Sequence, residues 1–428
     1  MKNRIGIRRE DKNRWERRTL LTPKHVKKLK ENSIDVIIQP SKIRAFSDED
    51  YKKAGATIQD DLSSCNAIFA VKEIPPDLFE YGHTYIFFAH VIKGQKHNMQ
   101  MLKKMMELKC NLIDYEKITN EKGARLIFFG RWAGLAGMAN TLSAYGEKLK
   151  KEGMSNPFSE IKHTHQYENL AEVKESILKV GKKIEEEGLP NEIIPMVIGI
   201  AGYGNVSRGC QEILDFLPIE EMNPRELVSS KKSYKTNKIY KVIFKEEDTV
   251  EPLSGQFDLQ DYYDNPENYC CRFYRYLPFL SILMNCIYWD KRYPRLVTKG
   301  WMRRLYEDGK KKLKVIGDIS CDIDGAIEFT MKATDIDSPV FTYDPIDESI
   351  SDAGKGVVVM AVDNLPCELP KEASDQFGDT LLDFIPSIAG VDFSKEFDKL
   401  NLPSPIKKAL ILHRGELTPD YKYIEKYL

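Results

Sequence analysis

A buried strand that runs directly into a glycine-rich turn and a helix is the feature that most constrains this chain. The apolar run MVIGIA leads into the turn GYGNVS, which starts at Gly202, and a helical pattern continues through RGCQEIL. Gly202 allows a sharp turn, and Gly204 has no Cβ to hold a ligand away from the backbone. The N–H groups and dipole of the helix start favour a negative charge. The arrangement predicts a Rossmann-type domain that binds a dinucleotide pyrophosphate through Gly202, Tyr203, Gly204, Asn205 and Val206.

The turn departs from the usual fingerprint at one position, and the next strand bears on the choice of cofactor. Ser207 stands where a third glycine is common, and Gly209 follows two residues later. A second strand is predicted at residues 219–223, where an acidic residue would hold the ribose hydroxyls of NAD. Asn223 ends this run and Arg225 follows, which suits the 2′-phosphate of NADP.

A shift in the register of that strand would change the prediction. Glu220 or Glu221 would then be the acid and NAD the cofactor, and Arg225 would be a surface residue at a helix start. We therefore expect NADP, with NAD as the alternative.

The first 130 residues alternate short apolar strands with helical stretches. Strands are predicted at residues 4–7, 35–39, 67–71, 85–89 and 110–114, and Thr22-Pro23 opens a helix. Strands that alternate with helices at this spacing indicate an α/β layer with a parallel sheet.

The length of 428 residues indicates two domains. We predict a substrate domain at residues 1–140 and 365–428, a dinucleotide-binding domain at 190–364, and connecting helices at 141–189. The C-terminal helices are expected to pack back on the first domain. Residues 229–272 are polar and carry Lys231, Lys232, Lys235, Lys238 and Lys241, so we expect a solvated loop there, of unknown role.

Two titratable side chains end very apolar strands. Lys72 follows AIFAV and His90 follows YIFFA. In open α/β sheets the crevice beyond such strand ends is where ligands bind, and a lysine and a histidine there can divide acid and base roles. A snorkelling lysine and a structural histidine are the alternative. Arg17, Arg18 and Arg125 are candidates for holding carboxylates.

Composition argues against several classes of protein. The net charge of −1 gives no overall field for nucleic acid or an anionic membrane, and no apolar run approaches the roughly 20 residues of a membrane helix. The start lacks the apolar core of a signal peptide, so we expect a cytoplasmic location. The eight cysteines form no C-x-x-C pair, so we expect reduced thiols and no metal. The oligomeric state stays open, a homo-oligomer included.

Several stretches together resemble one family. They are IGIRREDKNRWERRTLLTP, AVKEIP, FFAHVIKGQ, GYGNVSRGCQEI, NCIYWDKRYPRLVT, GDISCDIDGAIEF, and AVDNLPCELPKEAS with FGDTL. In this order they resemble lysine–2-oxoglutarate reductase, the saccharopine-forming half of the bifunctional lysine-degradation enzyme. They are more distantly similar to fungal saccharopine dehydrogenase, alanine dehydrogenase and the transhydrogenase α subunit. The resemblance covers residues 5 to about 380, and its saccharopine-cleaving half has no counterpart in this chain.

The resemblance implies a role for each matching residue. Lys72 and His90 match an acid–base pair, and Arg18 and Arg125 match arginines that hold substrate carboxylates. Lys93 and Glu116 match polar residues of the same site, and Asp322 matches a site aspartate of alanine dehydrogenase. The residues matching contacts near the nicotinamide and ribose are Asn285, Cys286, Ile287, Tyr288, Asp318 and Ser320. The family also implies that the glycine-turn domain is inserted into the other domain.

The implied activity is the reductive condensation of L-lysine with 2-oxoglutarate to saccharopine through an imine. Two other readings stay open. One is a related reductase that joins another amine to another keto acid, and the other is a nucleotide-binding regulator without chemistry. The presence of Lys72, His90, Arg18 and Arg125 together argues against the regulator.

Overall fold

The computed structural model describes residues 3–229, 233–351 and 354–428, so Lys231 and Lys232 lie outside the described residues. The chain divides into two compact units. Unit 1 comprises residues Met1–Phe128 and Pro370–Leu428, and unit 2 comprises Phe129–Leu369. Unit 2 is thus inserted into unit 1 along the chain. Within the described ranges, no helix is long and apolar enough to cross a membrane.

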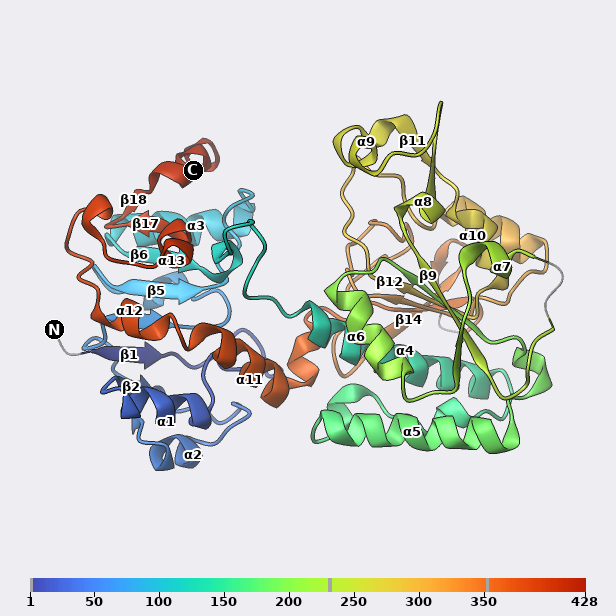
Figure 1. The fold of residues 1–428 in the computed structure, drawn as a ribbon, viewed down its shortest axis with the longest axis horizontal. Coiled ribbons are helices and arrows are strands. Elements are labelled where there is room, and N and C mark those ends of the chain that lie inside the picture. The colour runs from blue at the N-terminus through green and yellow to red at the C-terminus, as the bar shows by residue number, and fades with distance from the viewer. Residues whose placement is uncertain (1–2, 230–232, 352–353) are drawn as a thin grey trace. The chain divides into compact units, whose positions relative to one another are not determined.

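Unit 1 is built on one eight-stranded sheet in the order β18-β17-β6-β5-β4-β1-β2-β3. The six strands from β6 to β3 are parallel, and β17 and β18 are antiparallel. The strands are β1 Arg4–Ile7, β2 Asp35–Ile38, β3 Thr57–Ile58, β4 Ala67–Phe69, β5 Thr84–Phe87, β6 Asn111–Asp114, β17 Leu410–His413 and β18 Glu416–Leu417. The longer helices are α1 Pro23–Glu31, α2 Asp48–Lys53, α3 Lys96–Glu107, α11 Pro370–Leu381, α12 Ile385–Gly390 and α13 Ser404–Lys408 (Figure 1).

Unit 2 contains a second eight-stranded sheet, in the order β15-β14-β16-β13-β12-β7-β9-β8. The six strands from β16 to β8 are parallel, and β14 and β15 are antiparallel. The strands are β7 Val197–Ala201, β8 Ile219–Glu221, β9 Ile239–Phe244, β12 Ile282–Asn285, β13 Val315–Asp318, β14 Val340–Asp344, β15 Ser349–Ile350 and β16 Val357–Met360. The predicted fold class, two Rossmann-like parallel sheets with one unit inserted into the other, is confirmed.

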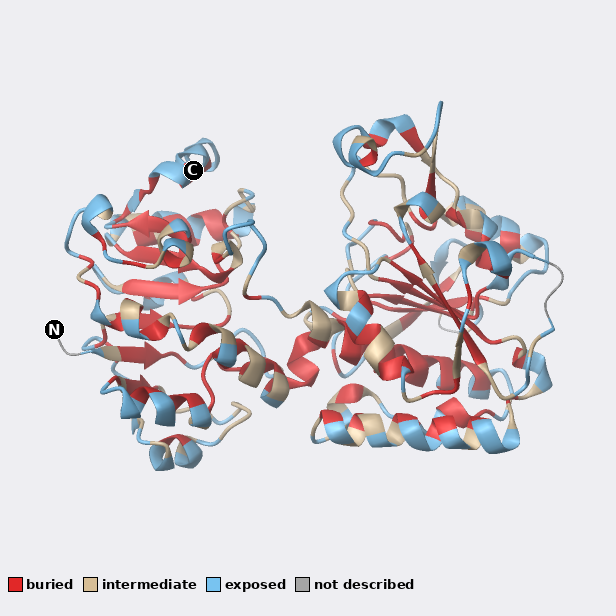
Figure 2. Ribbon diagram, in the orientation of Figure 1, coloured by how far each residue is buried: buried red, intermediate tan, exposed pale blue. Residues whose placement is uncertain are grey.

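The strand beside β7 is β9, and the short β8 lies at the sheet edge. The strand predicted at residues 219–223 is present as β8, but it pairs with β9 and not with β7. Burial explains the order. β9 is almost fully buried, as an interior parallel strand must be, whereas β8 carries Glu220 and Glu221 and is partly exposed. Figure 2 shows the interior strands of this sheet as buried.

Residues 233–272, the described part of the predicted solvated loop at 229–272 apart from residue 229, are not such a loop. They contain β9, α8 Glu246–Thr249, β10 Val250–Pro252, α9 Leu259–Asp264 and β11 Tyr269–Cys271 (Figure 1). β10 and β11 pair antiparallel, and Val250, Tyr262 and Tyr269 form a small core of their own. Lys241, on the interior strand β9, is only 5% exposed, and its ammonium bonds to Glu221 at 2.6 Å and Gln211 at 3.2 Å, contacts that offset the cost of burying its charge.

The predicted domain boundaries also need correction. The helices α4 Gly130–Lys151 and α5 Leu170–Glu187 belong to unit 2, so residues 129–140 are not part of the substrate unit. The reason is burial, because α4 packs against α6 Asn205–Leu214 and against β12, β13 and β16. Residues 365–369 also belong to unit 2, where the buried Glu368 accepts a bond from Asn140 at 2.7 Å.

Two glycines allow α4 and α6 to come into direct backbone contact. A Cβ on Gly134 would lie 2.0 Å from the carbonyl oxygen of Val206, and one on Gly209 would lie 2.1 Å from that of Arg131. Gly209 therefore lets the backbones of α6 and α4 approach closely, and Ser207, two residues earlier, is buried on α6.

Replacing Gly134 with alanine should destabilise unit 2. The added methyl group meets backbone rather than a flexible side chain, so we expect a loss of about 3 kcal/mol in the free energy of unfolding. The measurement is urea-induced unfolding. Gly300→Ala is the matched control, since that position in α10 Lys299–Glu307 has open space around it. It should be neutral or stabilising by up to about 1 kcal/mol, and equal unfolding midpoints for the two variants would contradict the packing argument.

Candidate functional site

The glycine turn of unit 2 has the backbone geometry expected of a phosphate-binding loop. Gly202 has φ 98° and donates its N–H to the carbonyl oxygen of Phe244 at 2.9 Å. A Cβ at Gly202 would lie 3.0 Å from the carbonyl oxygen of Cys286, so no other residue fits without displacement. Gly204 caps α6 and has nothing within 4 Å of a built Cβ. The turn therefore leaves open space at the start of α6.

A cavity of about 340 Å³ lies against this turn. Its walls are the turn itself, the end of β9, the loop after β12 and side chains of α9. Of the predicted cofactor residues, the structure brings Gly202, Tyr203, Gly204, Cys286, Ile287 and Tyr288 together around it. Lining residues that the sequence did not indicate include Lys245, Glu246, Tyr262 and Tyr263. The Tyr263 hydroxyl donates to Glu246 at 2.8 Å, which fixes this wall.

A buried polar network joins the ends of β12 and β13. Asn285 donates to Asp318 at 2.8 Å and to Ser320 at 3.2 Å, and Ser320 donates to Asp318 at 2.9 Å. Thr330, which the sequence did not indicate, donates to the other carboxylate oxygen of Asp318 at 2.6 Å. Burial raises the pKa of Asp318, although the bonds from Thr330, Asn285 and Ser320 favour its charged form. The predicted residue Asp322 is exposed in the following loop.

One atom of this network lacks a partner. The Oδ1 atom of Asn285 is buried and, among the described residues, accepts no hydrogen bond. A buried acceptor without a donor costs about 1–3 kcal/mol, so it indicates a place for a ligand donor. Together with the open Gly204 backbone, this atom fits a dinucleotide, whose carboxamide and hydroxyl groups are donors. Cys286 follows Asn285, and its Sγ lies 3.7 Å from that of Cys210.

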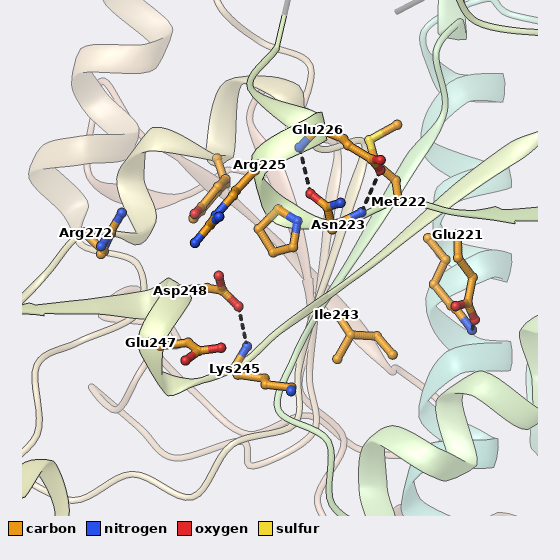
Figure 3. A pocket seen from close by; sticks show the side chains of 13 residues that line it. Glu221, Met222, Asn223, Arg225, Glu226, Ile243, Lys245, Glu247, Asp248 and Arg272 are labelled. Carbon is orange, nitrogen blue, oxygen red and sulfur yellow. Dashed lines mark hydrogen bonds and ion pairs between the residues drawn. The ribbon is translucent and has the colours of Figure 1, made fainter. Parts of the chain in front are cut away.

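Asn223 and Arg225 line a separate, larger pocket of about 780 Å³ at the ends of β8 and β9. Figure 3 shows Asn223 bonded to Glu226 and Lys245 bonded to Asp248 at its rim. Asn223 caps α7 Pro224–Leu227, and Arg225 lies on that helix. Since β8 is an edge strand, neither residue occupies the strand end next to the glycine turn, which corrects the basis of the NADP prediction.

Lys245 holds the position that Asn223 was expected to hold. It directly follows Phe244, whose carbonyl oxygen accepts the Gly202 N–H, and it lines both pockets. The larger pocket also contains Arg225 and Arg272. The strand end beside the turn is therefore a lysine followed by Glu246, rather than a single acidic residue.

In unit 1, the structure places Lys72 and His90 after the neighbouring parallel strands β4 and β5. Glu73, next to Lys72 in the chain, bonds through Oε1 to Nδ1 of His90 at 2.6 Å. Glu73 also pairs with Lys12 at 3.1 Å. Burial opposes the charge on Glu73, but the His90 ring and Lys12 hold its pKa below the usual range. Glu73 therefore fixes the His90 ring while staying anionic.

His90 has a left-handed backbone with φ 49°, which is uncommon for residues other than glycine, although asparagine, aspartate and histidine adopt it more often than the rest. The side chain of Asn98 donates to the His90 carbonyl oxygen at 3.2 Å and holds this conformation. Backbone strain of this kind clusters at functional sites.

Arg18 is 2% exposed and pairs with buried Glu16. Its Nε and Nη2 atoms donate to the two carboxylate oxygens of Glu16 at 2.8 and 2.6 Å. The sequence predicted that Arg18 holds a substrate carboxylate, and the structure gives that guanidinium a protein carboxylate as well. Arg17 donates instead to the Ile43 carbonyl oxygen at 3.2 Å.

Arg125 Nη2 and Glu116 Oε1 form an ion pair at 3.2 Å, and the Arg125 side chain is 44% exposed. Lys93 is exposed in the loop after β5. Beside Glu116, burial raises the pKa of Asp114 to about 7, while a bond from the Glu116 N–H lowers it. Arg125 is thus an accessible cation in unit 1.

Sequence reasoning missed the acidic partners of unit 1. Glu73 stands in the quoted motif AVKEIP and Glu16 in WERRTLLTP, so both were visible as letters. Their partners were not, because the bonds of Glu73 to His90 and Lys12 connect different strand ends. In the described parts of the chain no cluster of His, Cys, Asp or Glu is placed to hold a metal ion, and all eight cysteines are free thiols.

Comparison with known proteins agrees with this architecture. Residues 6–136 match the family model of the alanine dehydrogenase/PNT N-terminal domain, and residues 289–420 match that of the C-terminal domain. A solved structure of L-alanine dehydrogenase superposes with a TM-score of 0.63 at 17% identity, over 99% of each chain. That likeness shows the fold.

Curated relatives align along nearly the whole chain. An alpha-aminoadipic semialdehyde synthase of Arabidopsis thaliana is 39% identical over 99% of this chain and 41% of its own length, and the mitochondrial enzyme of Mus musculus is 36% identical over 99% and 47%. This chain thus spans less than half of these relatives. A saccharopine dehydrogenase [NAD(+), L-lysine-forming] of Yarrowia lipolytica is 26% identical over 86% of this chain and 87% of its own.

Both family models match in their proper order, and the same arrangement of two Rossmann-like units is present in the structure. The resemblance stated from the motifs is therefore confirmed, and the chain belongs to the alanine dehydrogenase/PNT family.

Proposed function

We propose that this chain is a nicotinamide-dependent oxidoreductase that condenses L-lysine with 2-oxoglutarate and reduces the product to saccharopine. The balanced reaction joins lysine, 2-oxoglutarate, NAD(P)H and a proton to give saccharopine, NAD(P)⁺ and water. The observation that carries the proposal is the pair His90–Glu73 next to Lys72 at the carboxyl ends of β4 and β5. The name of a relative that aligns along 86% of the chain, a saccharopine dehydrogenase [NAD(+), L-lysine-forming], supports lysine and saccharopine as reactants.

The residues of unit 1 supply the proton transfers that the condensation needs. The ε-ammonium of lysine must lose a proton before its nitrogen attacks the ketone carbon, and the hydroxyl that leaves must gain one. His90, oriented by Glu73, is suited to accept a proton at one ring nitrogen while the other stays bonded. Lys72 is suited to deliver a proton to the leaving hydroxyl. When bound, the dinucleotide supplies the hydride for the imine carbon.

The substrates bring three carboxylates, so cations must hold them. Arg125 is accessible, and its Nη2 forms an ion pair with Oε1 of Glu116 at 3.2 Å. Its exposed guanidinium is suited to receive a substrate carboxylate. Lys93 adds a second exposed cation. The expected role of Arg18 in holding a substrate carboxylate stays a prediction, since its guanidinium forms an ion pair with Glu16.

The cofactor would be held by unit 2. The Gly202–Gly204 backbone would take the pyrophosphate and Asn285 Oδ1 a donor of the ligand. We retain NADP as the proposed cofactor, for a reason other than the one the sequence offered. Lys245 stands at the strand end where an NAD site carries an acid, and Arg225 and Arg272 lie in the adjoining pocket. The cytoplasmic location and a homo-oligomer also stay predictions.

The first test supplies L-lysine and 2-oxoglutarate together and follows the loss of nicotinamide absorbance. We expect oxidation that requires both substrates, and the Lys72→Met variant should lose about 100-fold or more in kcat while binding NADPH as before. Lys310→Met, which removes an exposed lysine of unit 2, is the control. Turnover with pyruvate and ammonia instead, or with a different amine donor, would favour the related-reductase alternative. Dinucleotide binding without turnover on any pair would favour the regulator.

The second test concerns the choice of dinucleotide. Reversing the charge at the strand end with Lys245→Glu should lower the preference for NADPH over NADH, measured as the ratio of kcat/KM values, by about tenfold or more. The reason is that a carboxylate repels the 2′-phosphate and accepts bonds from ribose hydroxyls. Lys310→Glu makes the same charge change at the other end of the sheet and should leave the ratio unchanged. An unaltered ratio in Lys245→Glu would contradict the assignment.

A further inference from the structure

Glu10 makes a contact that the proposed reaction does not use. It follows β1, and its two carboxylate oxygens accept the backbone N–H groups of Val71 at 2.6 Å and Lys72 at 3.0 Å. Both donors lie just beyond the end of β4, in the segment that carries Lys72 and Glu73. A single partly buried carboxylate therefore holds the backbone of the segment that carries the side chains of Lys72 and Glu73.

The contact closes a chain of bonds between three strand ends. Glu10 joins the end of β1 to the end of β4, and the Glu73–His90 bond joins β4 to β5. Lys12, on the same segment as Glu10, pairs with Glu73. The backbone of Lys72 and the carboxylate of Glu73 are thus both held from the β1 segment, by Glu10 and Lys12.

The charges around Glu10 make its ionisation sensitive to its surroundings. The charged and titratable groups that face it, from the elements packed against it, are Arg8, Glu16, Arg44, Tyr115 and the adjoining Lys72. Burial, with repulsion from Glu16, raises the pKa of Glu10 to about 7, while the N–H bonds of Val71 and Lys72 and the charge of Arg8 oppose the rise.

We infer that Glu10 is a positioning residue for the Lys72–His90 centre, which holds the Lys72 backbone and sets the charge beside the Lys72 amine. The inference rests on the proposed function for its effect on turnover, but its geometry does not. Because the Glu10 carboxylate accepts the Lys72 N–H at 3.0 Å, the amine at the end of the same lysine side chain lies within roughly one Debye length, about 10 Å, of that carboxylate. Its negative charge favours the protonated amine, and its removal favours the neutral amine.

The competing explanation is that Glu10 only stabilises the loop after β4 through its bonds to the Val71 and Lys72 N–H groups. The structural role and the positioning role differ in what they predict. A purely structural contact affects the free energy of unfolding and the overall rate. A positioning residue also changes how the reactivity of the Lys72 amine depends on pH. The sign follows from charge, because a neutral side chain at position 10 should let Lys72 lose its proton at lower pH.

The experiment compares Glu10→Gln, which keeps the shape and removes the charge, with Glu10→Asp, which keeps the charge. Lys72 is labelled with trinitrobenzenesulfonate across a pH series and the labelled peptide is quantified by mass spectrometry. In Glu10→Gln the labelling midpoint should move to lower pH by about 1 pH unit, and the amides of Val71 and Lys72 should exchange hydrogen faster. We expect kcat to fall about tenfold, with the Kd for NADPH unchanged, and Glu10→Asp to restore the midpoint in part.

Glu49→Gln is the matched control, since Glu49 lies on α2 of the same unit, is exposed, and pairs only weakly with Lys52 at 3.8 Å. It should leave every readout unchanged. An unmoved labelling midpoint in a folded Glu10→Gln protein would overturn the inference, even if kcat falls. If the wild-type chain shows no condensation of lysine with 2-oxoglutarate, the proposed function fails. The labelling and exchange measurements then still decide the role of Glu10.

Discussion

The parallel pairing of β7 with β9 is the constraint on which the cofactor side of this molecule depends. A strand between two parallel neighbours is covered on both faces and must be apolar throughout. IYKVIF meets that requirement, with Lys241 neutralised by Glu221, and IEE does not. Burial therefore decides the strand order, and the strand order decides which side chains surround the Gly202 turn. Lys245 and Glu246 are placed there because β9 ends there.

The two units share one architecture, a mainly parallel eight-stranded sheet. In each, a parallel sheet collects polar groups beyond the carboxyl ends of its strands, where the backbone stops pairing. Unit 2 places a glycine turn and the Asn285–Asp318 network there, with Lys245 and Glu246 at the neighbouring end of β9. Unit 1 places ionisable groups there, and nearly every one of them has an opposite charge or a backbone donor beside it. This division suits unit 2 to hold a ligand and unit 1 to move protons.

The sequence predicted the parts of this structure that local patterns determine. The glycine turn needs only its own residues and the strand before it, and Lys72 and His90 follow strands that are recognisable by themselves. β9 was missed because its apolar residues stand in a tract dominated by lysines. The lysine content of the tract predicted a solvated loop, and the six-residue apolar run IYKVIF was not recognised as a strand. The place of β8 was wrong because sheet order depends on which strand can be buried on both faces. Glu10 and Glu16 were out of reach for another reason, since Glu10 bonds across sixty residues of chain and the tight pairing of Glu16 with Arg18 is set by burial.

The buried polar groups at the carboxyl ends of the strands in unit 1 and unit 2 also indicate how folding stability and ligand binding are balanced. At the strand ends of unit 1, Glu73 and Arg18 have charged partners, whereas Asp114 Oδ2 and the Tyr115 hydroxyl are buried and, among the described residues, form no hydrogen bond. The Arg18–Glu16 pair is buried and bidentate, and removing one partner from such a pair costs several times more than an exposed ion pair contributes. In unit 2 the network lacks one donor, because within the described residues no group donates a hydrogen bond to Asn285 Oδ1. The cost of that acceptor is borne by the fold without ligand, and a donor brought to it would lower the free energy of the bound state alone. An unsatisfied atom held rigidly by Asp318 and Ser320 thus favours binding more than a flexible one would, since no side chain has to be ordered when the ligand arrives.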